Sequence, residues 1–401
     1  MAVLAHEGVG TGVMHARLQG GFSAEVFDDL ASVEALWRGM EADAAVMGTP
    51  YQRFDWISAF AAARPGADLQ IVVLRDAGGR PRVLLPLVVA REGGVRVARV
   101  VGCKHANYHM PLFASREAAA MRPEDLVEHL RVFGCGAGID VFALSHQPRF
   151  WDGAANPLGA RSERAASDAY GLILGPDPEA TVKRVFSSDA RKKLRSKEKK
   201  LVEAFGPVAC RRAGTADEVR HYLSAFYEQK AQRFAAMGIA NPYADPLIRA
   251  FLARGTAIEA GTDPAIEVTA LVATRTDRVF AVFAGAVDGQ RYSGMMTSFD
   301  ADPMVSRSSP GDILLHHLIA DQTARGRRAF DLGVGEARYK ASICDETIEL
   351  GETTIPVTLR GHLFALRAVG TARLKRRIKR DPRLMALARR LRRRAVAPAA
   401  E

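Results

Sequence analysis

Four side chains that could do acid–base chemistry lie on or soon after one short apolar segment late in the chain. The segment RAFDLG (328–333) is predicted to be a strand and carries Asp331, and Glu336, Tyr339 and Lys340 come soon after it. A carboxylate can act as a general base, a phenol as a general acid, and a lysine can hold an anion. The same residues could instead form a charged loop with internal ion pairs, Asp331 with an arginine or Glu336 with Lys340. We therefore treat all four as candidate catalytic residues.

A serine-rich loop precedes the helix that leads into this strand. In SRSSPG (306–311), Ser309 is predicted to be the N-cap, Pro310 the first helical residue, and Asp312 the third position of a capping box. A helix N-terminus offers unpaired N–H groups to a phosphate. In the alternative, the loop is a plain helix start, and Asp312 repels an anion. The candidate phosphate-binding residues are Arg307, Ser308, Ser309 and Gly311.

One order of elements occurs twice: three strands in a meander, a loop, a helix and a further strand. In the second half the strands are expected at 266–274, 279–287, 291–299 and 328–333, with the helix at 310–325. In the first half they are expected at 69–75, 83–90, 95–102 and 139–145, with the helix at 123–133. Such self-similarity indicates a duplicated domain of the α+β class, in which helices flank a mixed sheet.

The length of 401 residues favours two domains. We expect a flexible N-terminus at 1–20, domains at 21–165 and 166–360, and a basic amphipathic tail at 361–401. No apolar run is long enough to cross a membrane, and the N-terminus does not resemble a secretory signal. The four cysteines are scattered without a C-x-x-C pair, so neither zinc nor a disulfide framework is indicated. A cytoplasmic protein without a bound metal is expected.

The excess positive charge lies in the tail. Residues 361–401 carry thirteen Lys and Arg and two Asp and Glu, which gives +11, while the remainder is balanced at 43 and 43. The segment 374–394 interleaves leucines with cations, and Pro382 divides it into two short helical pieces. This pattern favours adsorption to an anionic membrane surface. RNA contact and a disordered basic tail remain alternatives, although aromatic residues for base stacking are missing.

The ordered set of motifs resembles the acetyltransferase-like domain of CelD-type cellulose-biosynthesis proteins, within the GNAT superfamily and close to the FemAB-type transferases. The resemblance rests on SPGDILLHHLI and RGRRAFDLGVGEARYK behind SGMMTSFDAD, on the basic helix SSDARKKLRSKEKKLVEAFG, and on TPYQRFDWISAF and GCKHANYHMPLF. It implies tandem GNAT-like domains, with acyl-CoA as donor and its pyrophosphate held by residues 307–311. The pyrophosphate signature of GNAT enzymes is absent from this loop, and FemAB-type relatives use aminoacyl-tRNA instead.

We therefore expect an acyltransferase that moves an acyl group to an amine or hydroxyl in envelope or exopolysaccharide synthesis. The acceptor is expected in a cleft between the domains, lined by Asn107, Tyr108 and Arg233, although Asn107 and Tyr108 could form an ordinary turn and Arg233 a solvated ion pair. The alternatives are a FemAB-like transferase that uses aminoacyl-tRNA, or a non-catalytic scaffold at the membrane.

Overall fold

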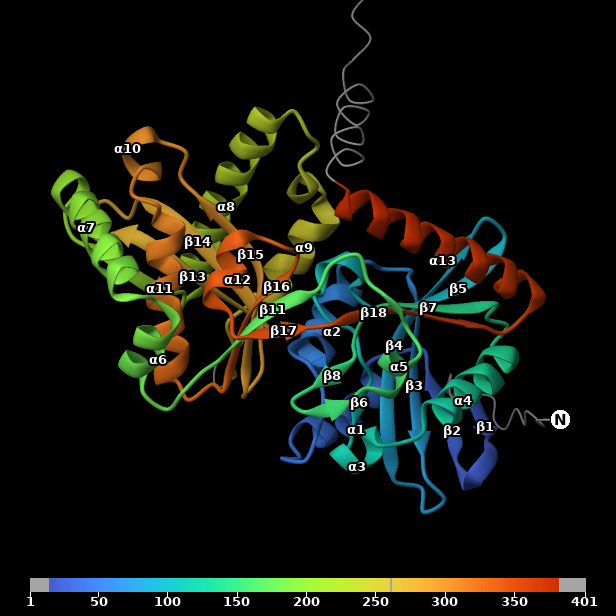
Figure 1. Cartoon of the computed structure of the whole chain (residues 1–401). Helices are drawn as coiled ribbons and strands as arrows, with labels where there is room; N and C mark the ends of the chain where they lie inside the picture. Colours follow the sequence, from blue (N-terminus) through green and yellow to red (C-terminus); the bar gives the residue numbers. More distant parts are fainter. Residues whose placement is uncertain (1–13, 260–261, 382–401) are drawn as a thin grey trace, which may run out of the picture. The chain divides into compact units, whose positions relative to one another are not determined.

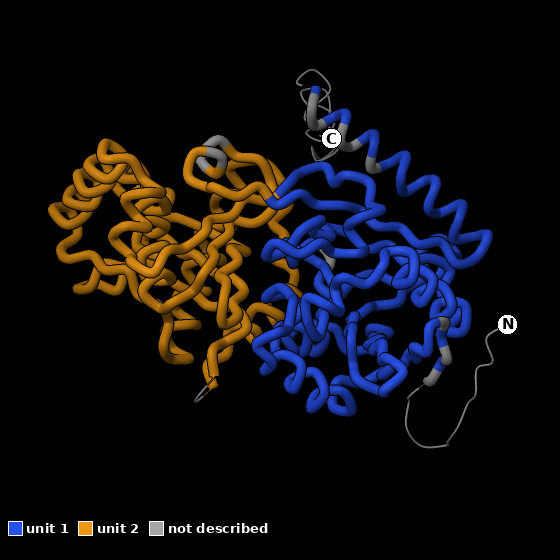
Figure 2. The backbone as a smooth tube through the Cα atoms, turned by 60° about the horizontal axis from the view of Figure 1, so that its bottom comes forward, with its two compact units in different colours: residues 1–168, 348–385 blue, residues 169–347, 386–401 orange. Residues whose placement is uncertain are grey.

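The computed structural model describes residues 14–259 and 262–381. Within them the chain forms two compact units (Figure 2). Unit 1 contains the residues up to Asp168 together with those from Ile348 onward, and unit 2 contains Ala169–Thr347. No described helix combines the length and the apolar character needed to cross a membrane.

Unit 1 is built on a sheet with the strand order β1-β2-β3-β4-β5-β7-β18-β10, with β6 paired to β4 (Figure 1). Its strands are β1 (Met14–Arg17), β2 (Ser23–Phe27), β3 (Asp68–Arg75), β4 (Pro81–Glu92), β5 (Val95–Val100), β6 (Leu112–Phe113), β7 (Val141–Pro148), β10 (Glu163–Arg164) and β18 (Leu350–Pro356), and β8 (Phe150–Trp151) forms a hairpin with β9 (Ala154–Ala155). Its helices are α1 (Ala31–Glu41), α2 (Phe54–Ala62), α3 (Arg116–Ala119), α4 (Pro123–Gly136), α5 (Pro157–Ala160) and α13 (Leu359–Arg380).

Unit 2 is built on a second sheet with the strand order β12-β13-β14-β15-β16-β11-β17. Its strands are β11 (Ala169–Ile173), β12 (Val208–Arg212), β13 (Ile266–Ala273), β14 (Val279–Val287), β15 (Arg291–Phe299), β16 (Ala329–Val334) and β17 (Glu346–Ile348). Its helices are α6 (Pro178–Val185), α7 (Ser188–Phe205), α8 (Ala216–Met237), α9 (Pro246–Gly255), α10 (Pro303–Ser306), α11 (Pro310–Ala324) and α12 (Arg338–Ile343).

The two sheets share one topology, as the repeated sequence pattern predicts. In each unit an antiparallel meander is followed by a helix and then by a strand that runs parallel to the third meander strand. The parallel pairs are β5 with β7, at Val97↔Val141, and β15 with β16, at Tyr292↔Phe330. In both units the next strand on that side is antiparallel, β18 beside β7 and β11 beside β16. The fold is therefore α+β, with two units of the same topology.

The division of the chain differs from the predicted boundaries. Strand β18 pairs with β7 in unit 1, so the residues before 360 do not all belong with the second domain. At the other end, β1 pairs with β2, so residues 14–17 are not a flexible terminus. Residues 1–13 of that predicted segment lie outside the described residues. In the predicted tail, residues 361–380 form part of a single helix, α13, which packs on unit 1, and residues 382–401 are not described.

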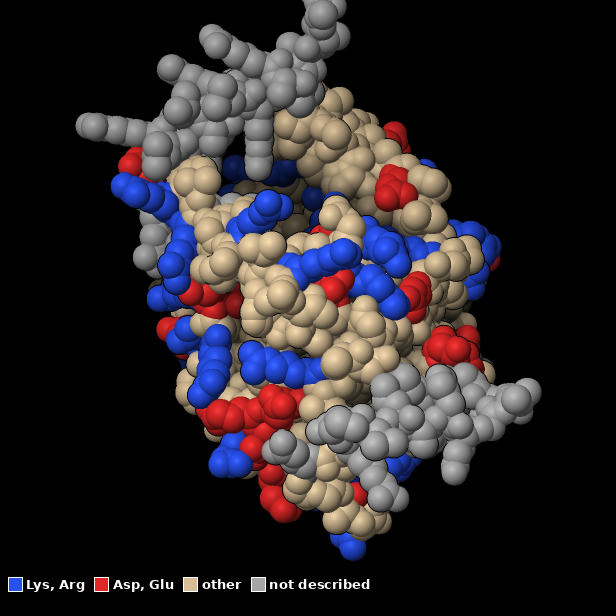
Figure 3. All heavy atoms as spheres, turned by 90° about the vertical axis from the view of Figure 1, so that its right-hand side faces the viewer, with Lys and Arg blue, Asp and Glu red and all other residues tan. Residues whose placement is uncertain are grey.

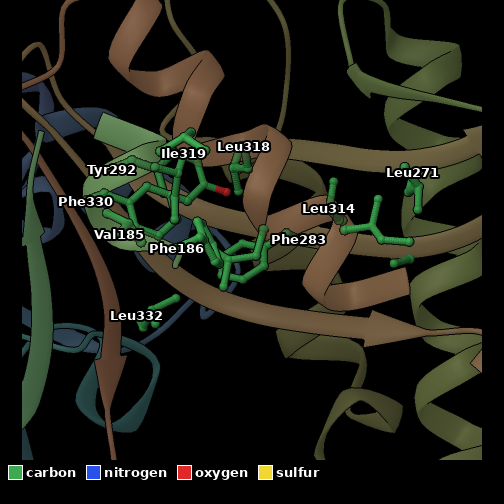
Figure 4. Packing of buried hydrophobic residues seen from close by; sticks show 14 of the residues in the cluster. Val185, Phe186, Leu271, Phe283, Tyr292, Leu314, Leu318, Ile319, Phe330 and Leu332 are labelled. Atoms are coloured by element: carbon green, nitrogen blue, oxygen red, sulfur yellow. The ribbon is translucent and has the colours of Figure 1, made fainter. Parts of the chain in front are cut away.

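The core of unit 2 lies between its sheet and helices α6 and α11 (Figure 4). Strands β13 and β14 are buried along their whole length, which explains why their sequences are nearly continuous apolar runs. Tyr292 and Phe330 stack face to face across the parallel pair, with ring centroids 5.0 Å apart. This packing fixes β15 and β16 together one residue before the point where they separate.

Candidate active site

The site begins where β15 and β16 separate. Their parallel pairing ends at Ser293↔Asp331, although β15 continues to Phe299 and β16 to Val334. Beyond that point β15 remains paired with β14, and β16 remains paired with β11. The loop before α11 follows β15, and the polar residues of the candidate site follow β16. Both segments therefore come after the point at which the two strands separate.

Asp331 is an internal anchor at this point. Its carboxylate accepts a hydrogen bond from Ser293 Oγ at 2.8 Å and from the Gly333 amide at 3.1 Å, and Arg291 Nη1 lies 3.8 Å away. The side chain is fully buried. The sequence allows an ion pair between Asp331 and an arginine as the alternative to a catalytic role, and Arg291 is that arginine. The contacts therefore favour a positioning role for Asp331.

Lys340 is hydrogen-bonded to the last residues of β16. Its ammonium donates hydrogen bonds to the carbonyl oxygens of Leu332, Gly333 and Val334 at 2.8, 3.1 and 3.3 Å. The side chain is 8% exposed, and burial lowers the pKa of its amine. An ammonium has three N–H donors, and the three carbonyl oxygens accept from all of them. The geometry therefore favours a role for Lys340 in fixing the loop, and not in binding a ligand.

The other two residues of the cluster differ from this buried pair. Glu336 is exposed, directly after Gly335, whose φ of +113° directs the chain away from the strand. No hydrogen bond or ion pair joins Glu336 to another described residue. Tyr339 lies in α12, and its side chain is outside the described residues. The carboxylate of Glu336 is therefore exposed, in contrast to those of the buried pair.

The N-terminus of α11 does not have the predicted capping box. Ser309 adopts a left-handed conformation with φ 49° and its side chain caps no helical amide. The amides of Ser308 and Ser309 instead donate to the carbonyls of Val305 and Ser306, because α10 immediately precedes the loop. Ser309 is the N-cap residue and Pro310 the first helical residue, as predicted, but the predicted capping box with Asp312 is wrong. At the far end, Gly326 has φ +78° after the last turn, as predicted.

Lys197 of α7 is the residue that the sequence did not single out. Its ammonium donates a hydrogen bond to Ser309 Oγ at 2.7 Å, which places a cation at the N-terminus of α11. Burial, His317 and the arginines Arg191 and Arg195 lower the pKa of His316 on α11. Helix α7 thus adds positive potential to the positive end of the helix dipole. In the sequence, only the many cations of α7 indicated this role, and a helix face rich in cations is more often simply exposed to solvent.

The remaining loop residues have different degrees of access. Arg307 is exposed and Ser308 is buried. At Gly311 no atom would lie within 4 Å of an added Cβ, so the backbone there is open. Arg278 fixes the start of the loop through Asp300 and Asp302, at 2.7 and 2.8 Å. The loop is therefore firmly based, with an open face at Gly311.

The predicted acceptor residues lie in two units. In unit 1, Asn107 donates to the Tyr51 hydroxyl at 2.7 Å, and Tyr108 is fully buried, with its ring 4.8 Å from that of Trp151. These contacts show the two residues packing within unit 1. In unit 2, Arg233 of α8 lies over the Phe299 ring at 5.2 Å.

Lys230, one turn before Arg233, was not predicted. Its amine lies 5.7 Å from the ring centroids of Phe226, Phe234 and Tyr243, and burial together with Arg233 lowers its pKa to about 8. Among residues 14–259 and 262–381, no group of three or more His, Cys, Asp or Glu is arranged to hold a metal ion.

One known family is similar to the segment that carries this site. Residues 188–341, from α7 into α12, match the acetyltransferase (GNAT) domain family. A comparison with curated proteins gave no match.

Two solved structures share the fold across both units. The chain resembles FemX with a TM-score of 0.56 at 8% identity, over 83% of this chain and 97% of FemX. It resembles a conserved protein of unknown function from Bacteroides thetaiotaomicron with a TM-score of 0.50 at 11% identity, over 82% of this chain and 99% of that protein. The class is therefore a GNAT-like fold used twice, in which a segment of unit 2 is similar to acetyltransferase (GNAT) domains.

Proposed function

We propose that this chain is an acyltransferase that takes an acyl group from acyl-CoA, with the donor site in unit 2. The observation that carries the proposal is the separation of β15 and β16 beside an α11 N-terminus that Lys197 makes more positive. The family match supports it, because residues 188–341 contain all of these elements.

In this proposal the loop before α11 holds the donor pyrophosphate. Gly311 contributes an open backbone amide, Arg307 and Lys197 contribute charge, and Ser308 and Ser309 line the loop. Because Ser308 is buried, we assign it to shaping the loop.

The reaction is direct transfer. An acceptor amine or hydroxyl attacks the thioester carbonyl, the C–S bond breaks as the new C–N or C–O bond forms, and the thiolate leaves. Glu336 is the proposed base that takes the acceptor proton, and Tyr339 is the proposed acid for the thiolate. Asp331 and Lys340 position the strand end that carries them. Much of the rate would come from this positioning.

The proposed acceptor belongs to envelope or exopolysaccharide synthesis. This assignment rests on the CelD-type resemblance of the motifs. Arg233 in unit 2 is proposed to contact the acceptor, and Asn107 and Tyr108 are proposed to bind the acceptor from unit 1. A cytoplasmic protein that associates peripherally with the membrane through residues 361–401 is consistent with the charge of that segment.

Calorimetric titration of the full chain with acetyl-CoA and palmitoyl-CoA tests the donor site. Ser309→Asp keeps a residue type that tolerates the left-handed conformation but adds a negative charge, and Lys197→Ala removes the cation. We expect each variant to weaken binding at least tenfold. The matched control is Lys199→Ala, because Lys199 lies on the same helix and points to solvent beside Glu203. No binding of any acyl-CoA by the unmodified chain would reject the proposal.

A transferase that uses aminoacyl-tRNA is the second candidate, favoured by the exposed cations of α7. Lys192, Lys193 and Arg195 are exposed on that helix. A gel shift with tRNA that weakens steeply with salt, in the absence of acyl-CoA binding, would support this reading. Binding to vesicles alone would instead favour a scaffold without catalysis.

A further inference from the structure

Unit 1 contains a cavity of about 820 Å³ beneath α13, whereas the proposed donor site belongs to unit 2. Helix α13 packs over β5, β7 and β18, and the cavity lies between the helix and these strands. Its volume is typical of small-molecule sites. None of the described residues that line it belongs to α4 or to the loop before α4, so the cavity is not the counterpart in unit 1 of the loop before α11.

Part of the lining of the cavity is apolar, and charged residues and threonines make up about half of it. Strands β5 and β7 contribute Val95 and Leu144, and the helix contributes Phe364, Ala368 and Val369. Leu363, also part of the lining, is 63% exposed. The cavity therefore offers an apolar interior with an apolar residue at its exposed edge, and both favour a hydrocarbon chain.

The charged residues of the lining are not balanced. Glu92 is paired with Arg99 at 2.7 Å and Glu163 with Arg373 at 2.7 Å, and Glu352 also has a partner within the protein. By contrast, Arg360 and Arg367 form no salt bridge with any described residue. Among the described residues, the cavity thus has two guanidinium groups outside any salt bridge, of which Arg360 interacts electrostatically with Asp140, and no carboxylate without a partner.

The two arginines lie on the same side of α13. They are seven residues apart, which is two helical turns, and Leu363 and Phe364 lie between them on that side. Hydrogen bonds from Thr358 Oγ1 and the Arg96 amide lower the pKa of Asp140, and the charge of Arg360 lowers it further. Figure 3 shows the side of the molecule on which α13 begins, where Lys and Arg side chains are frequent.

We infer that this cavity binds an amphiphile in which an apolar chain carries a phosphate or similar anionic head. The chain would occupy the apolar interior, and Arg360 and Arg367 would bind the head, because guanidinium groups bind phosphate oxygens through paired hydrogen bonds. The inference does not depend on the donor site in unit 2. The same chemistry occurs in soluble acyl phosphates and in phospholipids of a bilayer, and the experiment separates these sources.

The first arm uses dodecyl phosphate and the full chain in solution, followed by calorimetry. The double variant Arg360→Ala/Arg367→Ala removes both guanidinium groups, and Ala368→Trp fills the interior. The matched control is Arg377→Ala, an exposed arginine on the same helix that does not line the cavity. We expect at least a tenfold loss of affinity in the double variant, loss of binding in Ala368→Trp, and no change in Arg377→Ala. Both arginines are exposed, so the double variant should fold, as a thermal melt would verify.

The second arm uses phosphatidylcholine vesicles with and without phosphatidic acid, and measures lipid carried into the supernatant after the vesicles are pelleted. Binding of dodecyl phosphate with the expected variant pattern supports a soluble ligand. Extraction of phosphatidic acid with the same pattern supports a bilayer source. Equal binding by all variants would show adsorption to the basic surface and overturn the inference. Failure of both probes to bind would also overturn it, and neither result would affect acyl-CoA binding in unit 2.

Discussion

Glu336 and Lys340 lie four residues apart, yet their side chains have opposite environments. Glu336 is exposed and has no partner among the side chains that the structure describes, whereas Lys340 is buried and bonded to three carbonyl oxygens. We expect Glu336→Gln to leave the free energy of unfolding unchanged and to lower kcat at least tenfold, as the loss of a general base does. We expect Lys340→Met to lower the free energy of unfolding by about 2 kcal/mol, because buried carbonyls lose their donor.

Urea unfolding and transfer assays on the two variants test these roles. Arg254→Ala, at an exposed site on α9, is the control and should change neither the free energy of unfolding nor the activity. A Lys340→Met protein of normal stability that has lost activity would contradict the positioning role and return Lys340 to the reacting groups. A fully active Glu336→Gln protein would remove Glu336 as the base.

His109 gives unit 1 a pH-dependent stability. Burial and the nearby His146 lower the pKa of His109 to about 3, and its Nδ1 donates to the Ser145 carbonyl at 3.0 Å. The unfolded chain binds a proton near pH 6.5, but the folded chain does not until about pH 3. The protonation of His109 therefore has no effect on the free energy of unfolding above pH 7. As the pH falls below 6.5, it lowers that free energy. Between pH 7 and pH 5 we expect a loss of about 2 kcal/mol from this residue.

The measurement is urea unfolding at pH 7 and pH 5 for the unmodified chain and for His109→Asn. The variant should be less stable at both pH values, because a buried ring is removed. The difference between its free energies of unfolding at pH 7 and pH 5 should, however, be smaller than that of the unmodified chain. An equal difference in both proteins would show that other groups cause the acid sensitivity.

Residue patterns predicted local features well and long-range contacts poorly. The end of α11 at Gly326 could be predicted, because its positive φ is a local requirement. The state of Ser309 could not be predicted, because α10 forms just before it and its hydroxyl is taken by Lys197, which is distant in sequence. The burial of Asp331 against Ser293 likewise depends on which strands become neighbours.

The elements of each unit were also predicted closely, but their membership in a sheet was not. Strands β14 and β15 have the predicted bounds, because turn residues mark both ends of these apolar runs. The pairing of β18 with β7 joins segments about 200 residues apart, and no local pattern specifies it.

Helix α13 is positioned by a close approach at Gly361. A Cβ at this residue would lie 1.8 Å from the Asp140 carbonyl oxygen, so any side chain would push the start of the helix away from β7. We expect Gly361→Ala to lower the free energy of unfolding by about 2 kcal/mol. Gly370→Ala in the same helix is the matched control, because no atom lies within 4 Å of that added Cβ. It should raise stability by about 0.5 to 1 kcal/mol through helix propensity.

Thermal and urea unfolding of the two glycine variants measure this contrast. If both substitutions stabilise the chain, α13 does not dock at Asp140 as described. The result also concerns the cavity in unit 1, since Gly361→Ala should weaken dodecyl phosphate binding while Gly370→Ala should not.

At the scale of the whole molecule, the chain leaves unit 1 after Asp168 and returns to it at Ile348. Unit 2 is therefore continuous in sequence, and unit 1 is completed only by the last part of the chain. Strand β18 covers the edge of β7, and Thr353 and Thr358 bond to Leu158 and Asp140 in the first part of the chain.

A chain that ends at Thr347 should therefore lose unit 1 while it retains the donor site. Without β18 the edge of β7 becomes an unpaired strand, which favours local unfolding and aggregation. Hydrogen exchange should show loss of protection in β5 and β7, whereas β13–β15 remain protected and acyl-CoA binding is retained. A chain that ends at Asp381 is the control, because it keeps β18 and all but the last residues of the protein. If β7 remains protected in the shorter chain, unit 1 is stable without β18. If β14 also loses protection, unit 2 depends on unit 1 for its own stability, and the donor site cannot be studied in isolation.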